Sequence, residues 1–266
     1  NCARTINRCT WTSYFYSYST SGKYSLDQKT FSEIFGSATF VLIASVLNTD
    51  NINWKNMFTG IVQGIRKISA VTDFEGGRRL RIQLEDLAKN LLQGASVAVN
   101  GVCLTAIEIE EGWAEFDIIQ ESLDRSNLGS LKIGDSVDIE RASHFGDEVG
   151  GHHVTGHVDC TGIIREVRNT PNNRDILVSC GKEWMAYLIP KGWIAIDGIS
   201  LTVIDVGDNW FSLSLIPETL EQTVLGQKEE GDNVNLEFDH TTKVIVSTVE
   251  RMLPDIEKQM LVKMKN

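Results

Sequence analysis

The fold of this chain is decided by the stretch SVAVNGVCLT at residues 96–105. Apolar residues lead into an Asn-Gly pair and continue beyond it. This pair is the strongest short signal for a β-hairpin, because a type I′ turn needs positive φ at both central residues. The same design returns as WIAIDGISLT at residues 193–202. One hairpin therefore occurs twice, with Cys103 in the first copy and Ser200 in the second.

The repeat extends well beyond this hairpin. At the 97-residue separation of Gly101 and Gly198, Trp113 matches Trp210 and Glu140 matches Glu237. A tandem duplication explains such spacing better than chance. Each copy reads as short apolar strands separated by turn residues, which is typical of an all-β barrel or sandwich. The strands expected in the first copy are Phe58–Val62, Leu80–Leu84, Ser96–Val99, Val102–Ile109, Trp113–Ile118 and Ser136–Ile139, with a short helix at Glu85–Leu92.

We therefore predict an all-β protein of two related six-stranded barrels. The expected boundaries are 57–150 for the first barrel, 151–247 for the second and 248–266 for a C-terminal helix. Apolar residues recur along this helix at steps of three and four, so it has an apolar stripe that suits contact with other subunits.

Composition excludes several classes of function. The chain has 266 residues and a net charge of -11, which disfavours a nucleic-acid groove and docking on an anionic membrane. Its five cysteines form no CxxC pair, so a disulfide framework is not expected and a reducing compartment is favoured. No apolar run reaches the roughly 20 residues that span a bilayer.

Residues 1–56 differ from the rest of the chain. They are rich in Ser, Thr and Tyr, and their first acidic residue is Asp27. Such a prefix is typical of an organellar transit peptide, and the competing interpretation is a segment foreign to the functional protein. We expect a cytoplasmic location if the protein starts at Met57, and a plastid or mitochondrion if the prefix is a transit peptide.

Polar residues follow both repeated turns. Strand alternation places Cys103 and Thr105 on one face, and Ser200 and Thr202 on the corresponding face of the second copy. Each barrel then offers a short polar ladder that suits a polar heterocycle. The competing interpretation of Cys103 is an inert core cysteine.

A second polar cluster is the run GGHHVTGH at residues 150–157. An extended chain places His153 and His157 on one face and His152 on the other. Their spacing matches no strong zinc pattern, so we assign no metal ligand, and a proton-transfer histidine is the alternative to a metal site. Structural roles are expected for His152 and His153. Asp239 ends a strand and is either a functional acid or a solvated one.

Together these motifs resemble the riboflavin synthase family. The resemblance rests on MFTGIVQG at 57–64, the two hairpin stretches, GGHHVTGHVD at 150–159 and IPETL at 216–220, in that order. It implies two Greek-key barrels and a C-terminal helix that holds a homotrimer together. It also implies the dismutation of two 6,7-dimethyl-8-ribityllumazine molecules into riboflavin and 5-amino-6-ribitylaminouracil, with no cofactor. The active site would lie between the first barrel of one subunit and the second barrel of its neighbour.

The resemblance also implies roles for individual residues. The catalytic positions that it indicates are Cys103, His157, Ser200, Phe58, Ser96 and Asp239. The substrate contacts that it indicates are Thr59, Gly60, Val62, Thr105, Ser122, Gly156, Thr202, Ile216 and Thr219. Which barrel holds the donor substrate stays open.

Three other functions compete with this one. The first is a lumazine- or flavin-binding protein of the same fold without catalysis. Such proteins tend to lose the polar catalytic positions, so the presence of Cys103, His157 and Ser200 disfavours this function. The second is an assembly module that recruits partners through its helix. The third is a metal enzyme built on the histidine cluster, which stoichiometric metal in the purified protein would support.

Overall fold

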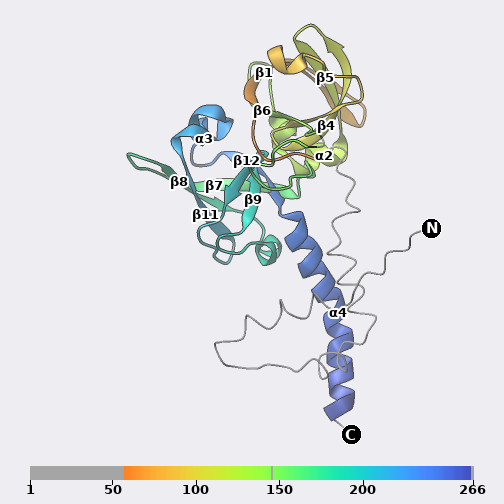
Figure 1. The fold of residues 1–266 in the computed structure, drawn as a ribbon, viewed down its shortest axis with the longest axis vertical. Helices are drawn as coiled ribbons and strands as arrows, with labels where there is room; N and C mark the ends of the chain where they lie inside the picture. Colours follow the sequence, from red (N-terminus) through yellow and green to blue (C-terminus); the bar gives the residue numbers. More distant parts are fainter. Residues whose placement is uncertain (1–56, 145, 265–266) are drawn as a thin grey trace, which may run out of the picture. The chain divides into compact units, whose positions relative to one another are not determined.

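The computed structural model describes residues 57–144 and 146–264, so the prefix 1–56 lies outside the described residues. Two sets of six antiparallel strands follow one another along the chain, and a long helix comes after the second set (Figure 1). The predicted fold class, two related barrels and a C-terminal helix, is confirmed.

The first set of strands closes into a barrel in the order β1-β2-β5-β4-β3-β6. All its ladders are antiparallel, including the β1–β6 pair that closes the ring. The two strands that follow and precede the Asn-Gly turn pair directly, with Ala98 opposite Cys103 and Ser96 opposite Thr105. The strands are β1 (Gly64–Phe74), β2 (Gly77–Gln83), β3 (Ser96–Val99), β4 (Val102–Glu110), β5 (Trp113–Ile119) and β6 (Ser136–Arg141).

The second set has the same connectivity, in the order β10-β9-β12-β7-β8-β11, but its end strands form no ladder. The difference arises in β10, which ends at Thr202, whereas its counterpart β4 continues to Glu110. The hydrogen bonds from Ile204 N to the Ser212 carbonyl and from Ser212 N to the Asp205 carbonyl, both 2.9 Å, bridge part of the opening. The strands are β7 (Cys160–Asn169), β8 (Arg174–Ser179), β9 (Trp193–Ile196), β10 (Ile199–Thr202), β11 (Trp210–Leu215) and β12 (Asn233–Phe238).

Each barrel has its own apolar core because side chains alternate along each strand. Phe116 on β5 and its counterpart Leu213 on β11 are both buried, each within a separate cluster. The repeat in the sequence is thus a repeat of complete cores.

The helices are short except for the last. The described helices are η2 (Glu85–Ala88), α2 (Gln120–Arg125), η3 (Asn127–Ser130), η4 (Lys182–Tyr187), α3 (Pro217–Gln222), η5 (Val224–Gln227) and α4 (His240–Met264). Among the described residues, no helix combines the length and the apolar character that crossing a membrane requires.

Several elements differ from the prediction. The strand β1 was not predicted, and the helix predicted at Glu85–Leu92 is the shorter 3-10 helix η2. Residues 58–62 form no strand, and Phe58 pairs with Val154 only through an isolated bridge. Helix α4 begins at His240, eight residues before the predicted start at 248. Its first turn contains β-branched residues, which obscured the helical pattern, and Asp239 caps it through hydrogen bonds from the N–H and hydroxyl of Thr242 at 2.7 and 2.8 Å.

The two repeated turns touch each other. Asn100 and Gly101 have φ values of 45° and 77°, and Asp197 and Gly198 have 47° and 87°, as type I′ turns require. A Cβ atom on Gly101 would lie 2.5 Å from the Gly198 nitrogen, and one on Gly198 would lie 2.8 Å from the Gly101 Cα. The glycines therefore allow the backbones of the two barrels to meet.

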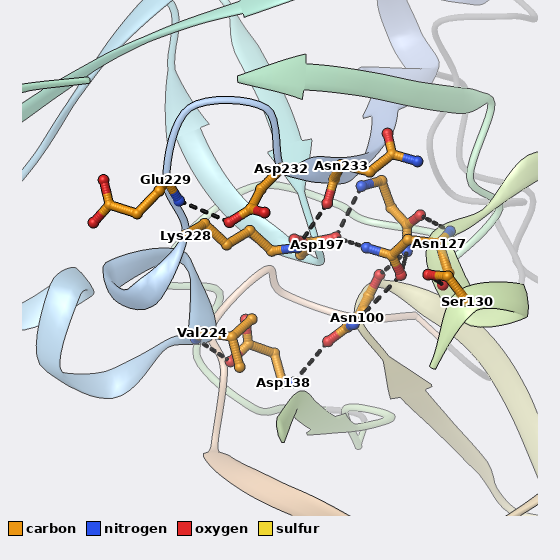
Figure 2. A network of polar contacts seen from close by, with 11 residues as sticks. Asn100, Asn127, Ser130, Asp138, Asp197, Val224, Lys228, Glu229, Asp232 and Asn233 are labelled. Carbon is orange, nitrogen blue, oxygen red and sulfur yellow. Dashed lines mark hydrogen bonds and ion pairs between the residues drawn. The ribbon is translucent and has the colours of Figure 1, made fainter. Parts of the chain in front are cut away.

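A buried polar network surrounds this contact (Figure 2). The main-chain N–H of Asn127 donates to Asn235 Oδ1 at 2.6 Å, and the N–H of Val224 donates to Asp138 Oδ1 at 2.9 Å. These two bonds cross between the barrels in opposite directions and join corresponding positions of the repeat. They satisfy backbone groups at the starts of η3 and η5, which would otherwise be buried without partners.

We expect Gly101→Ala to destabilise the protein more than Gly76→Ala does. Both glycines have positive φ, a conformation that costs another residue about 1–3 kcal/mol, but nothing lies within 4 Å of a Cβ at Gly76. Urea unfolding monitored by circular dichroism measures both losses. Equal losses would contradict a close contact between the turns.

Candidate functional site

Two short segments, residues 57–61 and 153–157, connect the barrels. We call them the first and the second arm. They meet where the main-chain N–H of Phe58 donates to the Val154 carbonyl at 2.9 Å and the N–H of Val154 donates back to the Phe58 carbonyl at 3.1 Å. Phe58 and Val154 are fully buried in a small apolar cluster with Ala98 and Ala195, one residue from each barrel's hairpin.

A buried glutamate holds each arm. Glu140 on β6 accepts hydrogen bonds from the N–H and hydroxyl of Thr59 at 2.6 and 2.8 Å, and from the N–H of Gly60 at 3.1 Å. Glu237 on β12 binds Thr155 and Gly156 in the same way, at 2.7, 2.8 and 2.9 Å. Burial raises the pKa of both carboxyls, that of Glu140 to about 7, and the hydrogen bonds from the arms oppose the rise.

Each arm then reaches the hairpin of the opposite barrel. The Gly60 carbonyl accepts the N–H of Ser200 at 2.8 Å, and the Gly156 carbonyl accepts the N–H of Cys103 at 2.9 Å. A Cβ on Gly60 would lie 2.6 Å from the Ser200 Cβ, and one on Gly156 would lie 2.5 Å from the Cys103 Cβ. The two candidate residues are therefore each positioned by both halves of the chain.

Ser200 is half-buried beside a histidine. Its Oγ lies 2.7 Å from His152 Nδ1, and the imidazole stacks on the indole of Trp193 with centroids 5.6 Å apart and planes 18° apart. His152 is only 8% exposed. Burial lowers the pKa of His152 to about 4; the charge of Asp239 opposes this shift and His153 adds to it. The imidazole is thus neutral near pH 7 and can accept a proton.

Cys103 occupies the corresponding place in the first barrel. Burial raises the pKa of its thiol, Glu237 adds to the rise and a hydrogen bond with Ser96 opposes it. The sulfur is therefore held as a thiol, whereas a reactive cysteine needs a thiolate. Ala142 stands where the second barrel has Asp239, and Ser96 stands where it has Trp193.

The remaining predicted residues lie around these two centres. His157 follows Gly156 in the second arm and is exposed, Val62 packs against the core of the second barrel, and Thr105 and Thr202 are exposed on β4 and β10. Ser122, Thr219 and Ile216 lie on or just before α2 and α3. Within residues 57–144 and 146–264, no hydrogen bond joins these last three to Ser200 or Cys103, so their assigned ligand contacts stay predictions.

His152 is the residue that sequence reasoning missed as a functional candidate. A structural role was expected for it, yet it is the histidine that contacts Ser200. Its signal was present in the alternation of the His-His pair, because the buried His152 and the exposed His153 point to opposite sides. Trp193 and the two arm-holding glutamates were not predicted as site residues either; only the repetition of Glu140 as Glu237 indicated the glutamates.

Comparison with known proteins finds one family. The model described as "Lumazine binding domain" matches residues 59–142 and again 155–239. The riboflavin synthase of Escherichia coli (strain K12) is 45% identical over 206 residues, which cover 77% of this chain and 97% of that protein. The riboflavin synthase of Chlamydia pneumoniae is 43% identical over 198 residues, covering 74% and 97% of the two chains.

Among solved structures, LumP has the same fold. Its complex with riboflavin aligns with a TM-score of 0.65 at 23% identity, covering 69% of this chain and all of LumP. Its complex with 6,7-dimethyl-8-(1'-D-ribityl) lumazine aligns with a TM-score of 0.62 at 24% identity, covering 68% and 98%. The two family matches coincide with the two barrels and their arms, and the resemblance seen in the sequence is confirmed. The chain therefore belongs to the riboflavin synthase family and carries two lumazine-binding domains.

Proposed function

We propose that this protein is a riboflavin synthase, which converts two 6,7-dimethyl-8-ribityllumazine molecules into riboflavin and 5-amino-6-ribitylaminouracil. One substrate gives a four-carbon unit to the other, so the atoms balance without an oxidant or a reductant. The observation that carries the proposal is the pair of duplicated sites at Cys103 and Ser200, each completed by an arm of the other repeat.

The duplication suits a reaction between two identical molecules. Two copies of one binding frame can hold two lumazines, and holding both in a reactive geometry supplies up to about 7–11 kcal/mol through proximity. The two sites must still differ, because donor and acceptor play different parts. They do differ in three positions around Cys103 and Ser200: Ser96 against Trp193, Ala142 against Asp239, and His157 in the second arm against Ile61 in the first.

The Ser200 site fits proton transfer. The reaction removes a proton from a methyl group of one lumazine and adds a nucleophile to the other. The neutral His152, 2.7 Å from Ser200 Oγ, can take the hydroxyl proton and return it. We assign Ser200, His152 and Asp239 to this transfer. Cys103, held as a thiol, is assigned to hydrogen bonding at the first site, next to His157.

We propose further that the protein is a homotrimer held by α4. Ile245, Val249 and Leu253 follow each other at steps of four along this helix, and they are 53%, 51% and 46% exposed. Such an exposed apolar stripe is suited to packing against copies of itself. The complete active site would then lie between the first barrel of one subunit and the second barrel of the next.

A non-catalytic lumazine- or flavin-binding protein is the alternative function. LumP, which shares the fold, was solved with riboflavin and with a lumazine. The Ser200–His152 pair favours the enzyme, because a binding protein has no need of a proton acceptor at this place.

The first test is turnover. Full-length protein incubated with 6,7-dimethyl-8-ribityllumazine and a chelator should form riboflavin, which absorbance and fluorescence follow, with two substrates consumed per product. Tight binding without turnover would instead support the binding protein. Loss of activity in the presence of the chelator would support the hypothesis of a metal enzyme.

Ser200→Ala should lower kcat by about 10²–10⁴-fold, the range that one proton-transfer group contributes. Cys103→Ser, which gives the first barrel the residue of the second, should change KM more than kcat, because Cys103 is assigned to binding. Ser69→Ala is the control, since within the described residues the Ser69 hydroxyl donates to the Arg81 carbonyl and not to a residue of the candidate site. Equal kcat values for Ser200→Ala and the control would refute the assignment.

The pH dependence of kcat/KM should carry an acid limb near pH 4, because a protonated His152 cannot accept a proton. Burial is the main cause of the low pKa, so Trp193→Ala should move this limb upward, toward the ordinary value of 6.5. Trp193→Phe keeps an aromatic cover and should move it less. An unchanged limb in Trp193→Ala would exclude His152 as its origin.

Val249→Asp should dissociate the trimer and abolish turnover, which analytical ultracentrifugation and the riboflavin assay measure together. Lys258→Asp is the matched control, because Lys258 is exposed and lies half a turn around α4 from Val249. A trimer that survives Val249→Asp would contradict assembly through this stripe.

A further inference from the structure

The network between the barrels is built from corresponding residues of the two repeats. Asn100 Oδ1 accepts the N–H of Asp138 at 2.8 Å, and in the second repeat Asp197 Oδ1 accepts the N–H of Asn235 at 2.8 Å. The reciprocal main-chain bonds, from Asn100 N to the Asp138 carbonyl and from Asp197 N to the Asn235 carbonyl, are 2.9 and 3.0 Å. The bonds that cross from the first residues of η3 and η5 form a third such pair. Three kinds of hydrogen bond therefore occur once in each half of the network.

A fourth bond occurs in one half only. Asn235 Nδ2 donates to the main-chain carbonyl of Asn100 at 2.8 Å, across the boundary between the barrels. The repeat relates Asn235 to Asp138 and Asn100 to Asp197, so Asp138 Oδ2 corresponds to this donor and the Asp197 carbonyl to its acceptor. Asp138 Oδ2 is buried and has no hydrogen-bond partner among the described residues. By this correspondence, an ionised carboxylate would put an acceptor where the other half of the network has a donor.

The surrounding charges are also unbalanced. Asp138 and Asp197 are 1% and 0% exposed, and the charge of Lys228 lowers the pKa of both. Figure 2 shows Lys228 beside Asp197. Lys228 Nζ lies 3.5 Å from Asp197 Oδ2, and Asp197 Oδ1 accepts two hydrogen bonds, from Asn127 Nδ2 at 2.9 Å and from Asn235 N. Burial raises the pKa of Asp197 as well, and its Oδ2 has no hydrogen-bond partner among the described residues, but Lys228 and the bonds from Asn235 and Asn127 oppose the rise. Because Lys228 is within ion-pair distance of Asp197, we take Asp197 as the carboxylate of the pair.

We propose that Asp138 is a neutral carboxylic acid at physiological pH and donates a hydrogen bond from Oδ2 to the main-chain carbonyl of Asp197. The acid thereby takes the place that the amide of Asn235 has in the other half, while its Oδ1 still accepts the N–H of Val224. Burial, the largest cause, raises the pKa of Asp138 well above its ordinary value; Asp197 adds to the rise, and the Val224 N–H and Lys228 oppose it.

This proton links the interface to the candidate site. Asp197 and Gly198 form the turn that leads into β10, and Ser200 follows two residues later. A hydrogen bond to the Asp197 carbonyl fixes this turn from the first barrel, as Asn235 fixes the Asn100 turn before Cys103 from the second. Asp138 is thus assigned as a positioning residue for the second hairpin.

Infrared spectroscopy tests the protonation state directly, without reference to activity. The carbonyl stretch of a protonated carboxyl group is separate from the bands of a carboxylate. Because the pKa of Glu140 is about 7, other carboxyl groups also contribute at neutral pH, so the difference spectrum of full-length wild type minus Asp138→Asn is measured. It should contain one protonated-carboxyl component, which shifts in D₂O. Asp197→Asn is the control and should retain this component. A difference spectrum without it, or a component that Asp197→Asn removes and Asp138→Asn leaves, would overturn the proposal.

The pH dependence of stability gives an independent test. A raised pKa in the folded state means that the folded protein binds more protons than the unfolded one, so the stability that this proton supplies is lost as pH rises through the folded pKa of Asp138. Asp138→Asn supplies the donor at every pH. Its Tm should match that of the wild type at neutral pH and exceed it increasingly at alkaline pH. A Tm lowered equally at every pH would mean that an ionised Asp138 is required, and would overturn the proposal.

Discussion

The backbone contact between two hairpin turns is the constraint on which the rest of this structure depends. Gly101 and Gly198 meet so closely that neither position has room for a Cβ. Because the turns touch, the strands after them start side by side, and the polar groups of Asn100, Asp197 and their neighbours become buried. Those groups must then be paired, and the cross-barrel network is the result. This contact also determines where Cys103 and Ser200 lie, because each follows its turn by two residues.

The two repeats share one set of backbone and glutamate contacts, which we call the frame, but the side chains inside this frame differ. The arms, the glutamates that hold them and the crossing bonds from η3 and η5 occur in both halves with nearly equal distances. The side chains within the frame differ: one hairpin carries a thiol and the other a hydroxyl with a buried imidazole. Differences inside a common frame allow two sites to bind the same molecule and treat it differently.

Much of the architecture could be predicted from residues 96–105 and their copy, because type I′ turns are specified by two adjacent residues. The arms could not, since Phe58–Val62 has the apolar alternation of a strand and its true partner lies in the other repeat. The start of α4 depends on the local Asp239 cap, and the β-branched residues that follow Asp239 conceal the helical pattern in the sequence. The alternation of His152 and His153 showed that they point to opposite sides, but not which of them reaches Ser200, because that contact depends on tertiary packing.

The exchange of arms has a consequence for the history of the chain. The first arm is held by Glu140 of its own barrel but completes the hairpin of the other, and the second arm reciprocates. A single ancestral barrel with such an arm would be complete only as a domain-swapped pair of identical subunits. Fusion of two copies turned that association into an intramolecular one, so each arm is supplied at a high effective concentration. Once fused, each half could diverge without losing its partner.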